Sequence, residues 1–125
     1  MMLYEGVEEM TLEECYNKIG ANYNDLVKRL GSKDFAELFA KKFLDDDSFA
    51  NLEKALAEQN AEDAFRAVHT LKGVAQNLSL DNLYRVSFTL TENLRGLEIT
   101  AESQPLFEAV KTEYERTVAA LKELA

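Results

Sequence analysis

Apolar residues recur along most of this chain at intervals of three and four positions, a spacing that places them on one face of an α-helix. Glycines, polar turns and capping side chains separate one such stretch from the next. The pattern therefore predicts a chain of helices joined by short connections. The predicted helices run over residues 11–19, 22–30, 32–44, 48–59, 60–78, 81–95 and 103–121.

Capping signals mark the two short helices near the N-terminus. Thr11-Leu-Glu-Glu14 has the form of a capping box, in which a hydroxyl and a carboxylate satisfy free N–H groups at a helix start. Gly20 and Gly31 are expected to end these helices, because glycine readily adopts the left-handed conformation. Residues 1–10 are acidic and are expected to be frayed or loosely docked.

Two later helices carry long apolar stripes that we expect to face the core. Ser32 can cap the first of them, and its stripe consists of Phe35, Leu38, Phe39 and Phe43. The second follows the turn Ser79-Leu80-Asp81, and its stripe consists of Leu83, Val86, Leu90, Leu94 and Leu97.

Four longer helices with short connections, each with one apolar face, are typical of an antiparallel four-helix bundle. We therefore predict an all-α fold in which residues 32–125 form the bundle and short additional helices in residues 1–31 flank it. The sequence has no internal repeat, low-complexity segment or linker, so residues 1–125 are expected to form a single domain.

Composition and charge argue against several classes of function. The formal net charge of −9 disfavours binding to nucleic acid or to an anionic membrane surface. No apolar run approaches the roughly 20 residues that span a bilayer, and we recognise no signal peptide, so membrane insertion is not expected. The single cysteine, Cys15, cannot form an internal disulfide, which fits a cytoplasmic location.

The chain also lacks the usual signatures of metal and nucleotide binding. With one histidine and one cysteine, it is not expected to hold a structural zinc ion. It has no glycine-rich phosphate loop and no dinucleotide fingerprint. We therefore expect no metal and no cofactor bound by this chain, and no kinase activity that depends on its own ATP site.

The single histidine, His69, lies in the middle of the helix predicted over residues 60–78. At about 100° per residue, it stands roughly 140° from the centre of the apolar stripe and is expected to face water. The stripe consists of Ala64, Val68, Leu71, Ala75 and Leu78. The residues expected on the same side as His69 are Phe65, Lys72, Gly73 and Gln76.

The residues on this side suit the transfer of a phosphoryl group. A neutral imidazole is a good nucleophile near neutral pH, and a phosphoryl group on it would carry up to about two negative charges. Lys72, one turn along the helix, is placed to neutralise that charge. Gly73 costs roughly 1 kcal/mol against alanine in a helix interior. That cost indicates close approach by a partner or a close helix–helix contact, and the position opposite the stripe favours the partner.

Two neighbours of His69 leave alternatives open. Phe65 is either a residue at the rim of the core or an exposed docking contact. Gln76 either hydrogen-bonds an imidazole or phosphate, or only keeps this side of the helix hydrated.

The run His69-Thr-Leu-Lys-Gly-Val-Ala-Gln-Asn-Leu78 resembles the core motif of histidine-containing phosphotransfer (HPt) domains of the stand-alone bacterial type. The resemblance extends to Asp47-Ser-Phe-Ala-Asn-Leu52 and covers most of the chain from about Ile19, with its specific part in residues 61–80. The chain departs from the family pattern at Ser79, where many members have glycine, and at Val74, which is bulkier than the usual small residue.

The resemblance implies a phosphoprotein of two-component signal transduction that relays phosphoryl groups and is a covalent carrier, not an enzyme. His69 would accept the group from a receiver-domain aspartate and pass it on, with Lys72 neutralising charge. The implied partners are response-regulator receiver domains, which bring Mg²⁺, and a hybrid or other histidine kinase. The residues expected to dock the partner are Phe65, Arg66, Gly73 and Gln76.

The local charge supports docking on this part of the chain. Residues 66–96 contain four basic and two acidic residues, which gives +2 within a chain of −9. A locally basic surface would steer an acidic receiver site toward His69.

Two other functions compete with the relay. One is a helical scaffold that binds receiver or kinase domains without being phosphorylated. The other is a hydrolase in which Glu62 or Asp63 orients His69, although a convex helix face offers no substrate pocket. Acid-labile, base-stable phosphate on the chain would distinguish the carrier from both.

Overall fold

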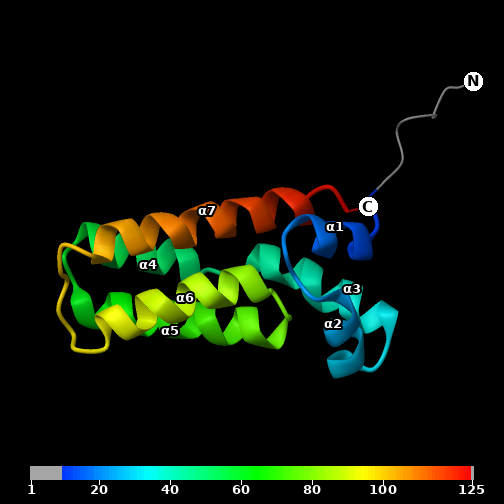
Figure 1. Cartoon of the computed structure of the whole chain (residues 1–125), viewed down its shortest axis with the longest axis horizontal. Helices are drawn as coiled ribbons and strands as arrows, with labels where there is room; N and C mark the ends of the chain where they lie inside the picture. Colours follow the sequence, from blue (N-terminus) through cyan, green and yellow to red (C-terminus); the bar gives the residue numbers. More distant parts are fainter. Residues whose placement is uncertain (1–9, 125) are drawn as a thin grey trace, which may run out of the picture.

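The computed structural model describes residues 10–124, and this part of the chain is all-α, as predicted. A 3-10 turn, η1 (Phe43–Asp45), separates the third helix from the fourth. The α-helices are α1 (Leu12–Lys18), α2 (Tyr23–Leu30), α3 (Lys33–Lys42), α4 (Ser48–Ala57), α5 (Ala61–Asn77), α6 (Asp81–Leu94) and α7 (Ser103–Leu121) (Figure 1).

The predicted boundaries of the N-terminal helices are confirmed. Both hydrogen bonds of the capping box between Thr11 and Glu14 are present, and Gly31 ends α2 with a φ of 86°. Met10 is partly buried and forms an isolated parallel bridge with Leu124, so it is not frayed. The expectation for residues 1–9 lies outside the described residues.

Helices α4 to α7 run side by side along the molecule and form a bundle, whereas α1, α2 and α3 gather at one end of it (Figure 1). Helix α5 packs against both α4 and α6, and α6 packs against α7. Phe49 of α4 closes the bundle by stacking on α7, with ring centroids 5.6 Å from Phe107 and 4.2 Å from Tyr114.

The apolar stripe predicted for α5 is confirmed. Ala64, Val68, Leu71 and Ala75 are completely buried, and Leu78 is nearly so. Burial of this stripe fixes the rotation of α5 about its axis, so the opposite side of the helix faces solvent.

The prediction for α3 is wrong about which side of the helix is buried. Only Phe43, at its C-terminal end, enters the core, while the other large residues of the stripe are exposed. Helix α3 turns two alanines, Ala36 and Ala40, toward the core instead. Small side chains let two helices approach closely, so the alanine side packs and the aromatic side remains outside. The exposed residues are Phe35 (54% exposed), Leu38 (48%) and Phe39 (40%).

Helix α6 ends before the last residue of the apolar stripe predicted for it. Leu83, Leu90 and Leu94 are buried as expected. The helix ends at Leu94, and Leu97 follows in the next turn with a φ of 60°, where it is 49% exposed.

Helices α1 and α2 are tied to the turn after α5. The Tyr16 hydroxyl donates to the backbone oxygen of Leu78 at 2.7 Å. Ser79 has a φ of 56°, the left-handed conformation in which glycine is common. Its buried hydroxyl donates to Oδ2 of Asp25 at 2.7 Å, a bond that glycine cannot form. Hydrogen bonds from Arg29 and from Ser79 hold the pKa of Asp25 below its usual value.

Ser87 of α6 is completely buried, and its hydroxyl is the one buried side-chain polar atom without a hydrogen-bond partner within residues 10–124. An unpaired buried polar group costs about 1–3 kcal/mol. We therefore expect Ser87→Ala to raise the free energy of unfolding by about 1 kcal/mol in urea denaturation.

Thr91 provides a matched control for Ser87→Ala on the same helix. Thr91 is equally buried, but its hydroxyl donates to the backbone oxygen of Ser87 at 2.7 Å. Thr91→Val should therefore give no gain in stability. If Ser87→Ala lowers the free energy of unfolding, the hydroxyl is not the unpaired group described above.

Candidate functional site

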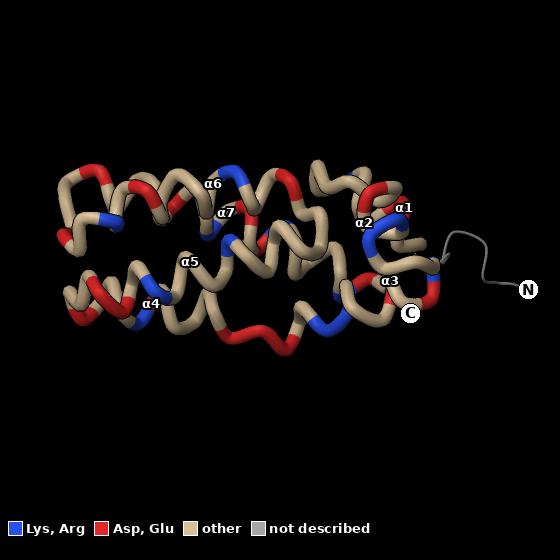
Figure 2. The backbone as a smooth tube through the Cα atoms, turned by 90° about the horizontal axis from the view of Figure 1, so that it is seen from below, with Lys and Arg blue, Asp and Glu red and all other residues tan. Residues whose placement is uncertain are grey.

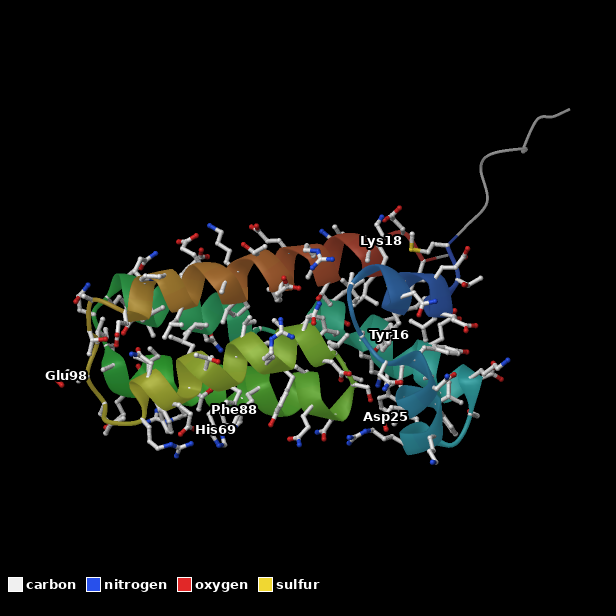
Figure 3. All side chains as sticks on the ribbon, in the orientation of Figure 1. Tyr16, Lys18, Asp25, His69, Phe88 and Glu98 are labelled. Atoms are coloured by element: carbon white, nitrogen blue, oxygen red, sulfur yellow. The ribbon has the colours of Figure 1, made fainter. Side chains whose placement is uncertain are left out.

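His69 lies on the solvent side of α5, opposite the buried stripe, and is exposed as the sequence predicted. Asn60 fixes the start of the helix, because its side-chain oxygen accepts a hydrogen bond from the Asp63 N–H at 3.0 Å. In Figure 3, His69 and Phe88 of α6 project from the same side of the molecule. The site is therefore an exposed surface to which both α5 and α6 contribute.

Phe65 is both a rim residue and a neighbour of the histidine. Its ring is partly buried and packs against the core, with its centroid 5.8 Å from that of the His69 imidazole. The guanidinium of Arg95, at the end of α6, lies over the same ring at 5.5 Å from its centroid. Phe65 is therefore a residue at the rim of the core, and its position beside His69 also leaves it available as a docking contact.

Lys72 lies against an aromatic ring of α6. Its Nζ is 5.5 Å from the centroid of the Phe88 ring, within the range of a cation–π interaction. Phe88 is 42% exposed and also contacts Tyr84, with ring centroids 6.1 Å apart. The amine is thus held close to the surface shared by the two helices.

Gly73 leaves open space beside His69. A Cβ added to Gly73 would meet no heavy atom within 4 Å outside its own helix. A close helix–helix contact therefore does not explain this glycine. Gln76, one turn after Lys72, is exposed.

Arg66 faces the α4 side of α5 and is paired within its own helix. Its guanidinium donates to Glu62 at 2.8 Å and to Asp63 at 3.2 Å. It lines a polar hollow of about 350 Å³ between α4 and α5, with Asn51 and Thr70 among the other lining residues. Glu62 and Asp63 are therefore paired with Arg66. This pairing argues against a hydrolase in which either carboxylate orients His69.

The basic charge of residues 66–96 is partly neutralised in the fold. Arg66 is paired as described, and Arg95 is paired with Glu92. Figure 2 shows Lys and Arg interspersed with Asp and Glu along these helices. The remaining basic residues that could attract a partner are Lys72 and Arg85.

Sequence reasoning did not identify the α6 half of the site, which consists of Phe88, Glu92 and Arg95. One signal was available, because Phe88 is an aromatic residue outside the apolar stripe of its helix. Its partner Lys72 was not recognisable, because the sequence does not state which residues of α5 and α6 stand opposite each other.

The fold and the site together define an all-α bundle that presents one exposed histidine beside a lysine. The Hpt domain family matches residues 43–122, from η1 to the end of α7. Among curated proteins and among solved structures, no match is found.

The chain belongs to the Hpt domain family, and its function is histidine phosphotransfer in a phosphorelay. Members of this family are phosphoryl carriers and not enzymes with ATP-binding motifs, and the family implies phosphorelay partners. In the part of the chain that the structure describes, no helix is long and apolar enough to cross a membrane. Among the same residues, no three His, Cys, Asp or Glu side chains are grouped so that they could hold a metal ion.

Proposed function

We propose that His69 is the phosphoryl acceptor and that it exchanges the group with aspartates of response-regulator receiver domains. The observation that carries the proposal is the exposure of the chain's single histidine on α5, with Lys72 one turn away. A hybrid or other histidine kinase would supply phosphoryl groups to the relay. Residues 1–125 act as one domain in this proposal, with α4–α7 as the carrier and the shorter helices supporting the turn after α5.

The proposed chemical step forms one bond and breaks one bond. A ring nitrogen of neutral His69 attacks the phosphorus of the receiver's aspartyl phosphate, while the bond from phosphorus to the carboxylate oxygen breaks. The other ring nitrogen keeps its proton, and the aspartate leaves as a carboxylate. Such a transfer depends on in-line positioning and charge stabilisation. In this proposal Mg²⁺ belongs to the receiver, and Lys72 is the cation that this chain contributes.

The docking surface of the proposal is centred on His69. Phe65 and Gln76 lie on its two sides along α5, and Gly73 lets the receiver backbone come close. Arg66 lies at the edge toward α4, where a receiver carboxylate would compete with Glu62 and Asp63.

The test is to incubate the protein with Mg²⁺ and a receiver domain phosphorylated by acetyl phosphate. The carrier gains phosphate that is acid-labile and base-stable, as phosphohistidine is. We expect His69→Gln to take up none while binding the receiver with nearly unchanged affinity, because the amide side chain is polar and of similar reach.

The competing functions give different results in the same experiment. A scaffold binds the receiver and gains no phosphate. A hydrolase releases free phosphate over many turnovers. Phosphate uptake by His69→Gln would show that another residue is the acceptor and would contradict the proposal.

A further inference from the structure

Lys72 stands near a carboxylate of α6 without being paired to it. Its amine lies over the Phe88 ring, with 5.5 Å between Nζ and the ring centroid. Glu92 is four residues after Phe88 on α6, so both side chains project from the same face of that helix. Hydrogen bonds and charge from Arg95, and more weakly the charge of Lys72, hold the pKa of Glu92 below its usual value. Glu92 is thus within electrostatic reach of the lysine.

Both carboxylate oxygens of Glu92 are occupied by Arg95. Nη2 of Arg95 donates to Oε2 at 2.7 Å, and Nε lies 3.2 Å from each oxygen. The same guanidinium lies over the Phe65 ring, at 5.5 Å from its centroid. A planar guanidinium can bridge a carboxylate and cover an aromatic ring at the same time, which the ammonium group of a lysine could not do in its place.

Within residues 10–124, the arrangement leaves Lys72 without an ion-pair partner and easily released from the ring. A lysine that pairs with a carboxylate presents a nearly neutral pair to an incoming phosphate. A lysine over an aromatic ring keeps its full positive charge, and at an exposed site the ring holds it only weakly. The phosphoryl group on His69, one turn away on α5, would therefore find a cation that is not already paired with a carboxylate.

We propose that Arg95 is a positioning residue of the phosphotransfer site, which acts by occupying Glu92 and so keeps Lys72 on Phe88 until His69 is phosphorylated. The inference rests on the proposed function of His69 and Lys72. No bond is made or broken in this step, because the lysine only moves from the ring to the phosphate. The inference assigns roles to Phe88 of α6 and to Arg95, the residue that follows this helix, neither of which belongs to the helix of the histidine.

The first test measures the half-life of phosphohistidine in the isolated protein after the receiver has been removed. Arg95→Ala frees Glu92 to pair with Lys72, and we expect the half-life to fall about two- to fivefold. Glu92→Gln combined with Arg95→Ala removes the competing carboxylate and should restore the parent half-life. Arg95→Ala should add nothing in a protein that already carries Lys72→Ala.

A matched control removes a similar ion pair elsewhere. Arg116 of α7 pairs with Glu113 at 2.9 Å, also three residues apart, and in addition donates to the backbone oxygen of Lys18 at 3.0 Å. We expect Arg116→Ala to leave the half-life unchanged, which would show that loss of a surface arginine is not itself the cause.

The second test needs no phosphate. The ring current of Phe88 should shift the ε-methylene proton resonances of Lys72 upfield in the unphosphorylated protein. Arg95→Ala should move these resonances toward ordinary lysine values, and the combination with Glu92→Gln should return them.

Two results would overturn the inference. One is a half-life in Arg95→Ala equal to that of the parent, and slower uptake from the receiver in that case would assign Arg95 to receiver docking. The other is failure of Glu92→Gln to rescue the variant, which would mean that Arg95 acts on the phosphate directly. If the parent takes up no phosphate while the lysine resonances behave as expected, the proposed function fails. The arrangement of Arg95, Glu92 and Lys72 would then be present in the protein but would have no role in phosphotransfer.

Discussion

Gly73→Leu is expected to give a protein that melts higher than the parent and cannot be phosphorylated. Gly73 lies within α5, and a Cβ added there meets no heavy atom of the described part of the chain within 4 Å outside its own helix. Leucine is the better helix former, so the free energy of unfolding should rise by roughly 0.5–1 kcal/mol. For a domain of this size, that corresponds to an increase of about 2–5 °C in melting temperature.

Phosphoryl transfer should fail for a different reason in the same variant. Gly73 is on the His69 side of α5, where, in the proposed function, the receiver brings its aspartyl phosphate close to the imidazole. A branched side chain there would hold the two surfaces apart, and a displacement of about 1 Å can cost about 100-fold in rate. The measurement is the initial rate of phosphate uptake from a phosphorylated receiver, together with a thermal melting curve.

Two further variants calibrate the result for Gly73. Gly73→Ala gains most of the helix propensity but adds only one methyl group, so it should be stabilised and lose less activity than the leucine variant. His69→Gln separates binding from chemistry, because it should still bind the receiver. Uptake by Gly73→Leu at the parent rate would show that the receiver does not approach this part of α5.

The orientation of the helix that carries the histidine was predictable because its apolar residues all lie on one side. Residues Ala64, Val68, Leu71 and Ala75 fall on one side of a helix, and all four are buried. Burial of that side places His69 outside by geometry alone. The same reasoning holds for any helix whose apolar face is the face that the rest of the chain covers.

Helix α3 shows where this reasoning stops. Periodicity tells which residues share a face, but not which face the remainder of the chain covers. In α3 the strongest apolar face carries Phe35 and Phe39, whereas the face in contact with the core carries Ala36 and Ala40. Close packing between helices selected the small residues, a property of the neighbours that no pattern within α3 contains.

The part of the site on α6 could not be predicted from the sequence for a related reason. That Phe88 meets Lys72, and that Arg95 covers Phe65, depends on how α5 and α6 are aligned along their axes. The pairing of Arg66 with Glu62, by contrast, joins residues four apart on one helix and follows directly from the sequence. Contacts within a helix could therefore be predicted from the sequence, whereas contacts between helices could be identified only in the structure.

Leu71→Ala should destabilise the fold while leaving the chemistry of the folded protein intact. Leu71 is completely buried on α5, two residues from the histidine but on the opposite side of the helix. Removing a buried leucine side chain typically costs about 2–5 kcal/mol, through lost transfer energy and the cavity left behind. Because domains are stable by only about 5–15 kcal/mol, this is a large fraction of the total.

The temperature dependence of activity distinguishes this variant from Gly73→Leu. Well below its lowered melting temperature, Leu71→Ala remains folded and should take up phosphate at nearly the parent rate. Between the two melting temperatures its activity should fall in step with the folded fraction measured by circular dichroism. Gly73→Leu should instead be inactive at every temperature, because its defect lies in the approach of the receiver.

Thr70→Ala is the neighbouring control for the core variant. Thr70 is exposed and its hydroxyl donates to the backbone oxygen of Arg66 at 3.0 Å, a bond that water can replace. Its loss should change the free energy of unfolding by no more than about 0.5 kcal/mol. If Leu71→Ala melts at the parent temperature while Thr70→Ala does not, the buried and exposed sides of α5 have been interchanged, and His69 would then face the core.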